Sequence, residues 1–322
     1  MNLKRKRNRN IGMITVFLMI AAGLFILSVA QGAASIAPAR VVEALAAPQP
    51  TTTDQIIWNI RLPRTLTGIF VGMNLALAGA ILQAIMRNPL ADPHIIGVSS
   101  GAGAAGIAIL LLLPAYPGLI VPAAFGGAMI AAAAVYLLAW KNGIRPVRLI
   151  LADVAVSALL GACISGLLIL YSDRVHGALL WMVGGLAAKS WNDVQLIFPY
   201  SCIGLGLSLC GAYYLNILQL GDEAAKGIGL NVELARVVFT AIAALLAASA
   251  VSVAGLLGFV GLIVPHAARL LIGTDYRYIM PASAILGAAV VTGSDTLARL
   301  LLAPMELPVG IIMAFLGAPF FL

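Results

Sequence analysis

The chain has little charge. Of its 322 residues only 10% are Asp, Glu, Lys or Arg, whereas 62% are hydrophobic, and the mean hydropathy is +1.05. So few polar side chains cannot cover a water-soluble body of this length. The apolar runs lack the strict alternation of a transmembrane β-barrel, and the 33 glycines suit closely packed helices. The composition therefore predicts an all-α, polytopic membrane protein.

Residues that carry chemistry are also scarce. The three cysteines, Cys163, Cys202 and Cys210, lie in apolar runs without paired ligand spacing, which supports neither a disulfide framework nor a zinc site. We interpret them as buried small hydrophobic residues. No HExxH, GxSxG or carboxylate cluster occurs, so we expect no catalytic residues, no bound cofactor, no metal site and no enzymatic activity in this chain.

Two glycine-rich stretches resemble nucleotide-binding loops. Residues 101–106 match GxGxxG, but they lie within an apolar run without a preceding strand, so close packing of small residues between helices is favoured. Residues 184–190 resemble a phosphate-binding loop, but Ala188 replaces the glycine before the lysine. We reject both as nucleotide sites.

About ten apolar runs are long enough to cross a bilayer. We expect spans at residues 11–31, 61–86, 94–113, 118–140, 147–171, 191–214, 237–253, 258–272, 279–298 and 307–322. The basic arm at residues 1–10 precedes the first span, and such an arm holds an N-terminus in the cytoplasm. The first run is longer than the apolar part of a signal peptide, so we expect an uncleaved helix, and we favour this topological role of the arm over nucleic-acid binding.

The distribution of basic residues supports this topology. With the N-terminus inside, thirteen fall on the cytoplasmic side: Lys4, Arg5, Lys6, Arg7, Arg9, Arg87, Lys141, Arg145, Arg148, Lys226, Arg236, Arg269 and Arg277. Six fall outside: Arg40, Arg61, Arg64, Arg174, Lys189 and Arg299. The excess predicts an even number of spans with both termini in the cytoplasm.

One polar segment, residues 221–236, interrupts the apolar runs in the second half of the chain. Its glycines indicate a broken, turn-rich unit, and its charged side chains suit contact with a soluble partner at the cytoplasmic face. Three arginines are predicted on the opposite, outer face, where basic residues are fewer: Arg61, Arg64 and Arg299. Their positive charge favours docking of an acidic soluble partner. Single interfacial arginines also commonly reach to lipid headgroups.

Two carboxylates stand out within the predicted spans. Asp153 and Asp295 fall near the ends of their helices rather than at the membrane midplane, where an ion-coupling site would need them. We expect interfacial pairing for both, for example Asp153 with Arg148. Coupling to an ion gradient therefore has little support.

Several stretches resemble one known family. They are RLPRTL at 61–66, GAILQ at 79–83, NPLA at 88–91, IGVSSGA at 96–102, WMVGG at 181–185, GFVGLIVPHAAR at 258–269 and ELPVG at 306–310. These motifs, in this order over nearly the whole chain, closely resemble the permease subunits of iron-siderophore and cobalamin ABC importers, the FecCD-type family. The resemblance implies a single transmembrane permease domain, residues 1–322, in the cell membrane. It also implies a second permease copy or paralogue, cytoplasmic ATPase subunits that use ATP, and a substrate-binding protein outside.

The resemblance implies roles for particular residues. The segment that couples the permease to the ATPase comprises Gly221, Asp222, Glu223, Ala224, Ala225, Lys226, Gly227 and Gly229. The arginines that dock the binding protein map onto Arg61, Arg64 and Arg299. The inner gate, in the loop before the fifth span, maps onto Pro146 and Val147, where a family member carries small hydroxyl residues.

The resemblance implies import of a ferric siderophore, with cobalamin or haem as the alternative cargo. An ion-driven secondary transporter is a less favoured alternative. The particular siderophore, the identity of the second permease and the role of Asp153 stay open. The last span also ends without the basic tail usual in the family, so whether the natural chain continues past Leu322 is open too.

Overall fold

The computed structural model describes residues 3–32, 35–141 and 146–320, and over these residues it is helical without strands. Residues 1 and 2 of the basic arm, Arg145 of the charge count and Leu322 lie outside the described residues. The α-helices are α1 (Leu3–Ala30), α2 (Pro38–Ala46), α3 (Thr52–Ile56), α4 (Leu62–Met86), α5 (Val98–Leu112), α6 (Ile120–Ala139), α7 (Pro146–Leu170), α8 (Val175–Val183), α9 (Trp191–Gln219), α10 (Asp222–Gly227), α11 (Val232–Ala254), α12 (Val260–Ile272), α13 (Tyr276–Leu301) and α14 (Val309–Phe320). Short helical turns are η1 (Ile57–Arg61), η2 (Pro93–Ile96), η3 (Pro117–Leu119) and η4 (Ser172–Arg174).

Ten of these helices coincide with the ten predicted spans. Seven stretches of the described chain are long and apolar enough to cross a membrane, and the shorter apolar helices α5, α12 and α14 fall on the third, eighth and tenth predictions. The predicted polytopic all-α architecture is confirmed. The short helices α2, α3 and α8 had no counterpart in the prediction, and the polar segment 221–236 divides between α10 and the first turn of α11.

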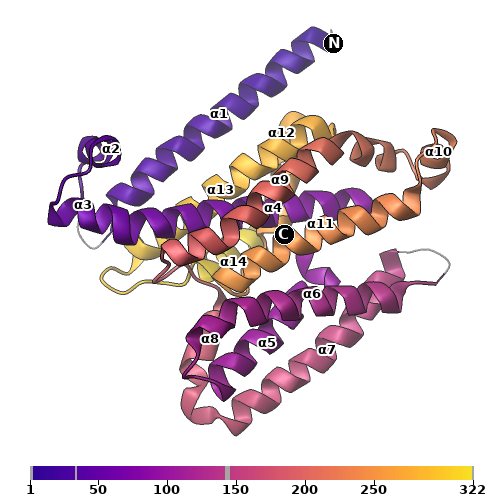
Figure 1. Cartoon of the computed structure of the whole chain (residues 1–322). Helices are drawn as coiled ribbons and strands as arrows, with labels where there is room; N and C mark the ends of the chain where they lie inside the picture. The colour runs from indigo at the N-terminus through magenta and orange to yellow at the C-terminus, as the bar shows by residue number, and fades with distance from the viewer. Residues whose placement is uncertain (1–2, 33–34, 142–145, 321–322) are drawn as a thin grey trace.

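Figure 1 shows the helices as an elongated bundle with α10 at one end and α2 and α3 at the other. We call these the α10 end and the α2 end. The start of α1 lies on the side of the α10 end. The chain crosses the bundle an even number of times between the basic arm and α10. The basic arm and the polar segment, both predicted to be cytoplasmic, therefore lie at the same end.

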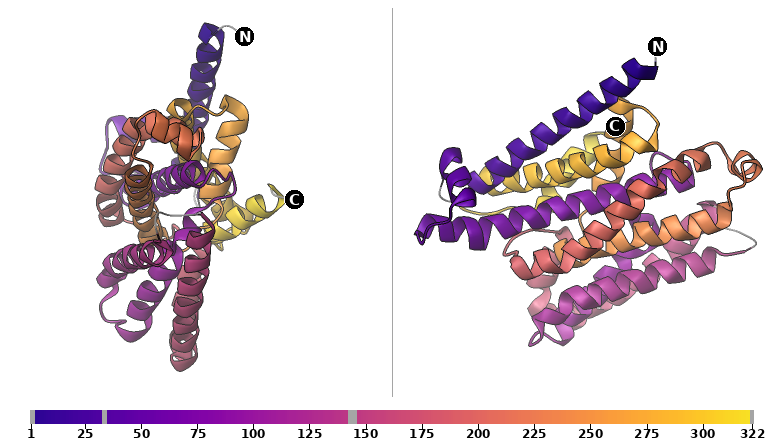
Figure 2. Two further views of the ribbon diagram at one scale, coloured as in Figure 1. Left: turned by 90° about the vertical axis from the view of Figure 1, so that its right-hand side faces the viewer. Right: turned by 45° about the horizontal axis from the view of Figure 1, so that its top comes forward.

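Helix α4 forms the centre of the bundle. Most of its side chains are buried, and it packs against α9, α11, α12 and α13. Helices α5, α6 and α7 form a second group, as Figures 1 and 2 show. Helices α5 and α6 pack against α11 and so connect this group to the helices around α4.

Glycines allow the closest helix crossings. A Cβ on Gly101 of α5 would overlap the carbonyl oxygen of Gly127 on α6, and a Cβ on Gly127 would overlap that of Gly101. Gly72 of α4 and Gly287 of α13 show the same reciprocal contact. The hydrophobic effect does not drive helices together inside a membrane, because lipid tails are as apolar as the helix surfaces. Small residues favour helix association there because they let the two backbones approach closely. The packing role predicted for the GxGxxG stretch is confirmed.

The contact between α5 and α6 gives a matched test. Gly127→Leu should reduce the yield of folded protein and lower its melting temperature, because the added side chain must push apart two backbones, at a cost of about 1–3 kcal/mol or more. Gly126→Leu, one residue earlier, should have little effect because nothing lies within 4 Å of its Cβ position. Size-exclusion profiles and thermal unfolding in detergent would measure both; equal behaviour of the two variants would contradict the packing account.

The prediction of buried cysteines is wrong. Cys163, Cys202 and Cys210 are all exposed on the surface of the chain. An apolar run shows that a residue lies at membrane depth, but the outer surface of a membrane helix is itself apolar. Hydrophobic neighbours therefore do not tell which face of the helix carries the thiol.

Candidate functional site

Four ionised side chains meet at the α2 end. Arg64, in the first turn of α4, binds Asp295 of α13 through two hydrogen bonds of 3.0 and 2.9 Å from Nε and Nη2. Its Nη1 also donates to Glu306 Oε2 at 2.7 Å. Arg299 lies one turn beyond Asp295, with its Nε 3.2 Å from the same carboxylate. The Asp295 side chain is only 3% exposed, whereas that of Glu306 is 45% exposed.

The end of α1 completes this cluster. Arg61 donates from Nη1 to the carbonyl oxygens of Val29 and Ala30, at 2.9 and 2.7 Å. Arg299 donates to Ser28 Oγ at 2.9 Å, and Ser28 in turn shares a hydrogen bond with Thr65. The three arginines predicted on the outer face thus come together.

Each of the three arginines is buried within this chain. Their carbonyl and carboxylate partners account for the burial, since a guanidinium withdrawn from water needs its hydrogen bonds satisfied. Of the two acidic partners of Arg64, only Glu306 has a substantially exposed side chain.

The pairing predicted for the intramembrane carboxylates is half right. Asp295 pairs with two arginines, as expected for a carboxylate near a helix end. The proposed pairing of Asp153 with Arg148 is wrong: Asp153 accepts a hydrogen bond from Ser157 at 3.1 Å, and Arg148 donates to the carbonyl oxygen of Lys141 at 2.6 Å. Ser157, one turn along α7, is close enough to satisfy the carboxylate locally.

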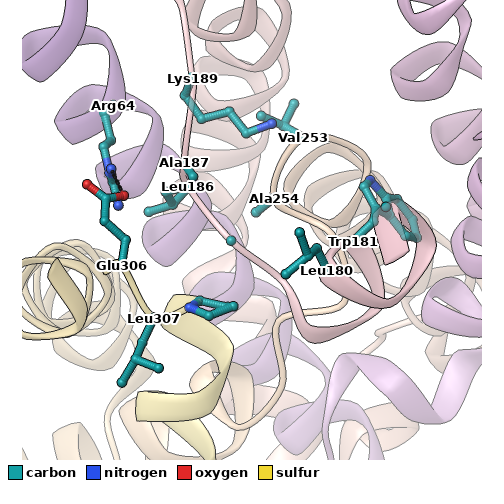
Figure 3. Close-up of a pocket in the computed structure, with 13 residues that line it drawn as sticks. Arg64, Leu180, Trp181, Leu186, Ala187, Lys189, Val253, Ala254, Glu306 and Leu307 are labelled. Carbon is teal, nitrogen blue, oxygen red and sulfur yellow. Dashed lines mark hydrogen bonds and ion pairs between the residues drawn. The ribbon is translucent and has the colours of Figure 1, made fainter. Parts of the chain in front are cut away.

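A pocket of about 340 Å³ opens beside Arg64 and Glu306. Figure 3 shows Glu306 facing Arg64 on one side, with Lys189 reaching across the top and Trp181 on the other side. Lys189 also lies 3.7 Å from Asp193. The pocket thus combines an apolar wall with charged groups along its rim.

The ends of α8 and α11 and the start of α14 meet beside this pocket. Backbone hydrogen bonds join Gly185, after α8, to Ala254, at the end of α11, and Gly310, in α14, to Gly184; they measure 2.8 and 3.1 Å. Gly184 and Gly255 adopt positive φ angles of 80° and 77°, and a Cβ on Gly255 would overlap the carbonyl oxygen of Trp181. Irregular backbone at membrane depth is tolerated where protein buries it or where it lines a cavity. In transporters such breaks mark the substrate route.

The predicted coupling segment lies at the opposite end of the bundle. Gly221, with φ 101°, precedes the first residue of α10, and Gly229, with φ 93°, lies in the loop after the helix. Asp222 Oδ1 accepts a hydrogen bond of 2.8 Å from Arg236 of α11 and lies 3.3 Å from Arg87, which follows α4. Because the Arg236 side chain is only 7% exposed, this contact fixes α10 to the bundle.

The outer face of the coupling segment is open. Glu223, Ala224 and Lys226 are exposed, whereas Ala225 is fully buried against the bundle. Large apolar side chains around it are exposed too: Ile228, Leu220, Leu234 and, in the loop after α4, Leu90. An exposed apolar group with a charged rim is typical of a protein interaction surface.

The predicted inner gate falls at the start of α7. Val147 is exposed, and Pro146 is the first residue of the helix, with its side chain outside the described part of the chain. Asp153 lies two turns further along α7, and Ser157 joins it to Ser100 of α5 through a hydrogen bond of 3.0 Å.

Comparison with known proteins gives a consistent result. The model of the FecCD transport family matches residues 18–322. The chain is 41% identical to the Fe(3+)-citrate import system permease protein YfmD of Bacillus subtilis, over 99% of this chain and 96% of that one. It is 45% identical to the cobalamin import system permease protein BtuC of Halobacterium salinarum, over 85% of this chain and 74% of that one.

A solved structure agrees along nearly the whole chain. It is described as an inward-facing conformation of a metal-chelate type ABC transporter, and it superposes with a TM-score of 0.84 at 29% identity, covering 96% of this chain and 97% of that one.

Proposed function

The chain belongs to the FecCD transport family and is a multi-pass ABC importer permease, and from this premise we propose that it carries ferric siderophores across the cell membrane. The observation that carries the cargo proposal is the full-length similarity to an Fe(3+)-citrate import permease. Both termini lie in the cytoplasm in this proposal, with the α10 end inside and the α2 end outside. The thirteen basic residues assigned to the inner side support this orientation.

The two ends of the bundle suit two different partners. At the α10 end, the exposed face of residues 221–229 receives a cytoplasmic ATPase subunit, which hydrolyses ATP in place of this chain. At the α2 end, the pocket beside Arg64 receives cargo from an extracytoplasmic binding protein. A second permease, identical or paralogous, completes the pathway.

Transport follows from alternating access. ATP binding and hydrolysis move the ATPase subunits, and α10 passes this movement to α11 through the bond between Asp222 and Arg236. The helix ends at Gly184 and Gly255, where φ is positive, let the outer part of the pathway change shape without unfolding the long helices. Pro146 and Val147 are candidates for the inner gate by position.

Cobalamin is the second candidate cargo. The 45% identity to a cobalamin import permease favours it, although that match covers less of the chain than the match to the iron permease. Haem is the third cargo implied by the resemblance. An ion-driven mechanism has no observation in its favour.

Uptake by cells tests the cargo proposal. Radioiron-labelled siderophores, ferric citrate among them, would be given to three strains. The first lacks the gene, the second has the gene restored, and the third has the gene restored but the ATPase inactivated. We expect one chelate to require both the gene and the ATPase. If no iron chelate depends on the gene, the iron proposal fails and labelled cobalamin and haem are tested next; uptake that needs the gene but no ATPase would contradict the importer mechanism.

The exposed edge of the arginine cluster suggests how a binding protein docks. We propose that an acidic side chain of that protein displaces Glu306 from Arg64 Nη1. Glu306→Gln should then strengthen docking by about twofold to fivefold at low salt, because exposed ion pairs contribute about 0.2–1 kcal/mol. Surface plasmon resonance with the permease in nanodiscs would measure the affinity. Glu43→Gln on α2 is the control, and weaker docking of Glu306→Gln than of this control would contradict the proposal.

A further inference from the structure

An apolar groove runs along the surface between α1, α4, α9 and α13. It encloses about 450 Å³, and its walls are almost entirely hydrophobic. Helix α1 contributes Leu18, Ala22 and Phe25, and helix α13 contributes Pro281, Ala284 and Ala288. All four helices are membrane-spanning candidates, so the groove opens toward the hydrocarbon of the bilayer.

A second pocket, of about 430 Å³, lies where α1 and α13 begin, at the α10 end. Four basic side chains, Lys4, Lys6, Arg7 and Arg277, and one carboxylate, Asp275, line it. Asp275 is already held by Arg277 at 2.6 Å. Among residues 3–32, 35–141 and 146–320, no carboxylate forms an ion pair with the α1 residues that line the pocket, Lys4, Lys6 and Arg7. The pocket therefore carries a net positive charge that no carboxylate of the described residues neutralises.

The pocket and the groove lie on the same face of both helices. Leu18 and Phe25 follow Arg7 by 11 and 18 residues, which is about three and five full turns. On α13, Ala288 follows Arg277 by 11 residues, again about three turns and about 16 Å. The hydrocarbon of one leaflet is about 15 Å thick. On each helix a groove residue, Leu18 on α1 and Ala288 on α13, thus lies about one acyl chain length from the basic pocket.

Helix α1 is fixed against α12 and α13 at this level. The Asn10 amide, oriented with its nitrogen toward the carbonyls, donates to the carbonyl oxygen of Ile272 at 3.2 Å. Phe17 is buried against Ala268 and Ala282. The first turns of α1 nevertheless project beyond the other helices, as Figure 2 shows. The side chains of Lys4, Lys6 and Arg7 are exposed.

We propose that this pocket and groove together bind an anionic phospholipid of the cytoplasmic leaflet. The phosphate lies among Lys4, Lys6 and Arg7, and an acyl chain lies in the groove between α1 and α13. Basic residues next to a membrane span attract anionic headgroups, and the continuous apolar face supplies the site for the chain. A zwitterionic lipid lacks the net charge that the pocket requires.

Native mass spectrometry of the purified full chain tests the site. Phosphatidylglycerol and phosphatidylcholine with identical acyl chains would be titrated against the protein, together with inorganic phosphate as a soluble probe. We expect phosphatidylglycerol to bind at least tenfold more tightly than phosphatidylcholine, and millimolar phosphate to leave its binding unchanged.

Paired variants separate this site from general charge attraction. Lys4→Gln with Arg7→Gln should weaken phosphatidylglycerol binding about tenfold or more. Arg5→Gln with Arg9→Gln removes the same charge from the opposite face of α1 and should change binding by less than about twofold. Equal losses in the two pairs would overturn the site, as would displacement of the lipid by phosphate.

A second pair tests the groove. Ala22→Phe fills it and should weaken phosphatidylglycerol binding severalfold, whereas Met19→Phe, at a position 61% exposed outside the groove, should not. Unchanged binding by Ala22→Phe would show that the acyl chain lies elsewhere and would overturn the proposal. Melting temperatures without added lipid would confirm that all variants fold.

Discussion

Asp295→Asn is expected to destabilise the permease more than any other conservative change of a charged residue at the α2 end. The asparagine has the same shape but leaves Arg64 and Arg299 buried side by side without their shared counter-charge. Removing one partner from a buried ion pair costs about 3–5 kcal/mol. The melting temperature in detergent should fall by on the order of 10 °C.

Glu306→Gln is the matched control for Asp295→Asn. It removes the other carboxylate that binds Arg64, but at a largely exposed position, so the expected cost is below about 1 kcal/mol. The double variant Arg64→Gln with Asp295→Asn should recover part of the stability, because it removes one of the two stranded charges. Similar melting temperatures for Asp295→Asn and the native chain would show that the cluster does not stabilise the fold.

Ile228→Asp is expected to abolish transport without unfolding the protein. Ile228 follows α10 and is 59% exposed, so the isolated chain tolerates the charge. In an interface with the ATPase the isoleucine would be buried, and an unpaired carboxylate there costs several kcal/mol. We expect the ATPase to be lost during co-purification and uptake to fall below about a tenth of the native rate, since 1.4 kcal/mol already corresponds to tenfold.

The control for Ile228→Asp places the same charge at the other end. Tyr116, in the loop after α5, is 61% exposed at the α2 end, and Tyr116→Asp should leave co-purification of the ATPase unchanged. If Ile228→Asp retains the ATPase and normal uptake, residues 221–229 do not form the coupling surface.

The sequence predicted the helices well because the bilayer imposes a simple rule. A span needs about 20 apolar residues, and the ten runs could be counted directly. Helix α8 was missed because its nine residues, Val175–Val183, are too few to form a span. The start of α11 was placed at residue 237 instead of Val232 because Glu233 and Arg236 resemble a loop, although they form its first turn.

The candidate site was only partly accessible from sequence. Arg64 and Arg299 could be noticed because positive charge is unusual on the outer side. The burial of these arginines could not be predicted. Asp295 and Glu306 lie 231 and 242 residues from Arg64 along the chain, and only the folded bundle brings them together. The anionic lipid site was equally hidden: the basic arm was visible, but its alignment with a groove depends on how α1 packs on α13.

Helix α11 connects the two ends of the molecule mechanically. Near its start Arg236 holds Asp222, and at its end Ala254 holds Gly185. These residues are 18 positions apart, which is five full turns and about 27 Å, so both attachments lie on one line along the helix. If α10 receives the movement of the ATPase, as proposed, α11 can carry it toward the pocket as one rigid rod. One residue inserted between the two attachments would turn them about 100° out of line and break this alignment.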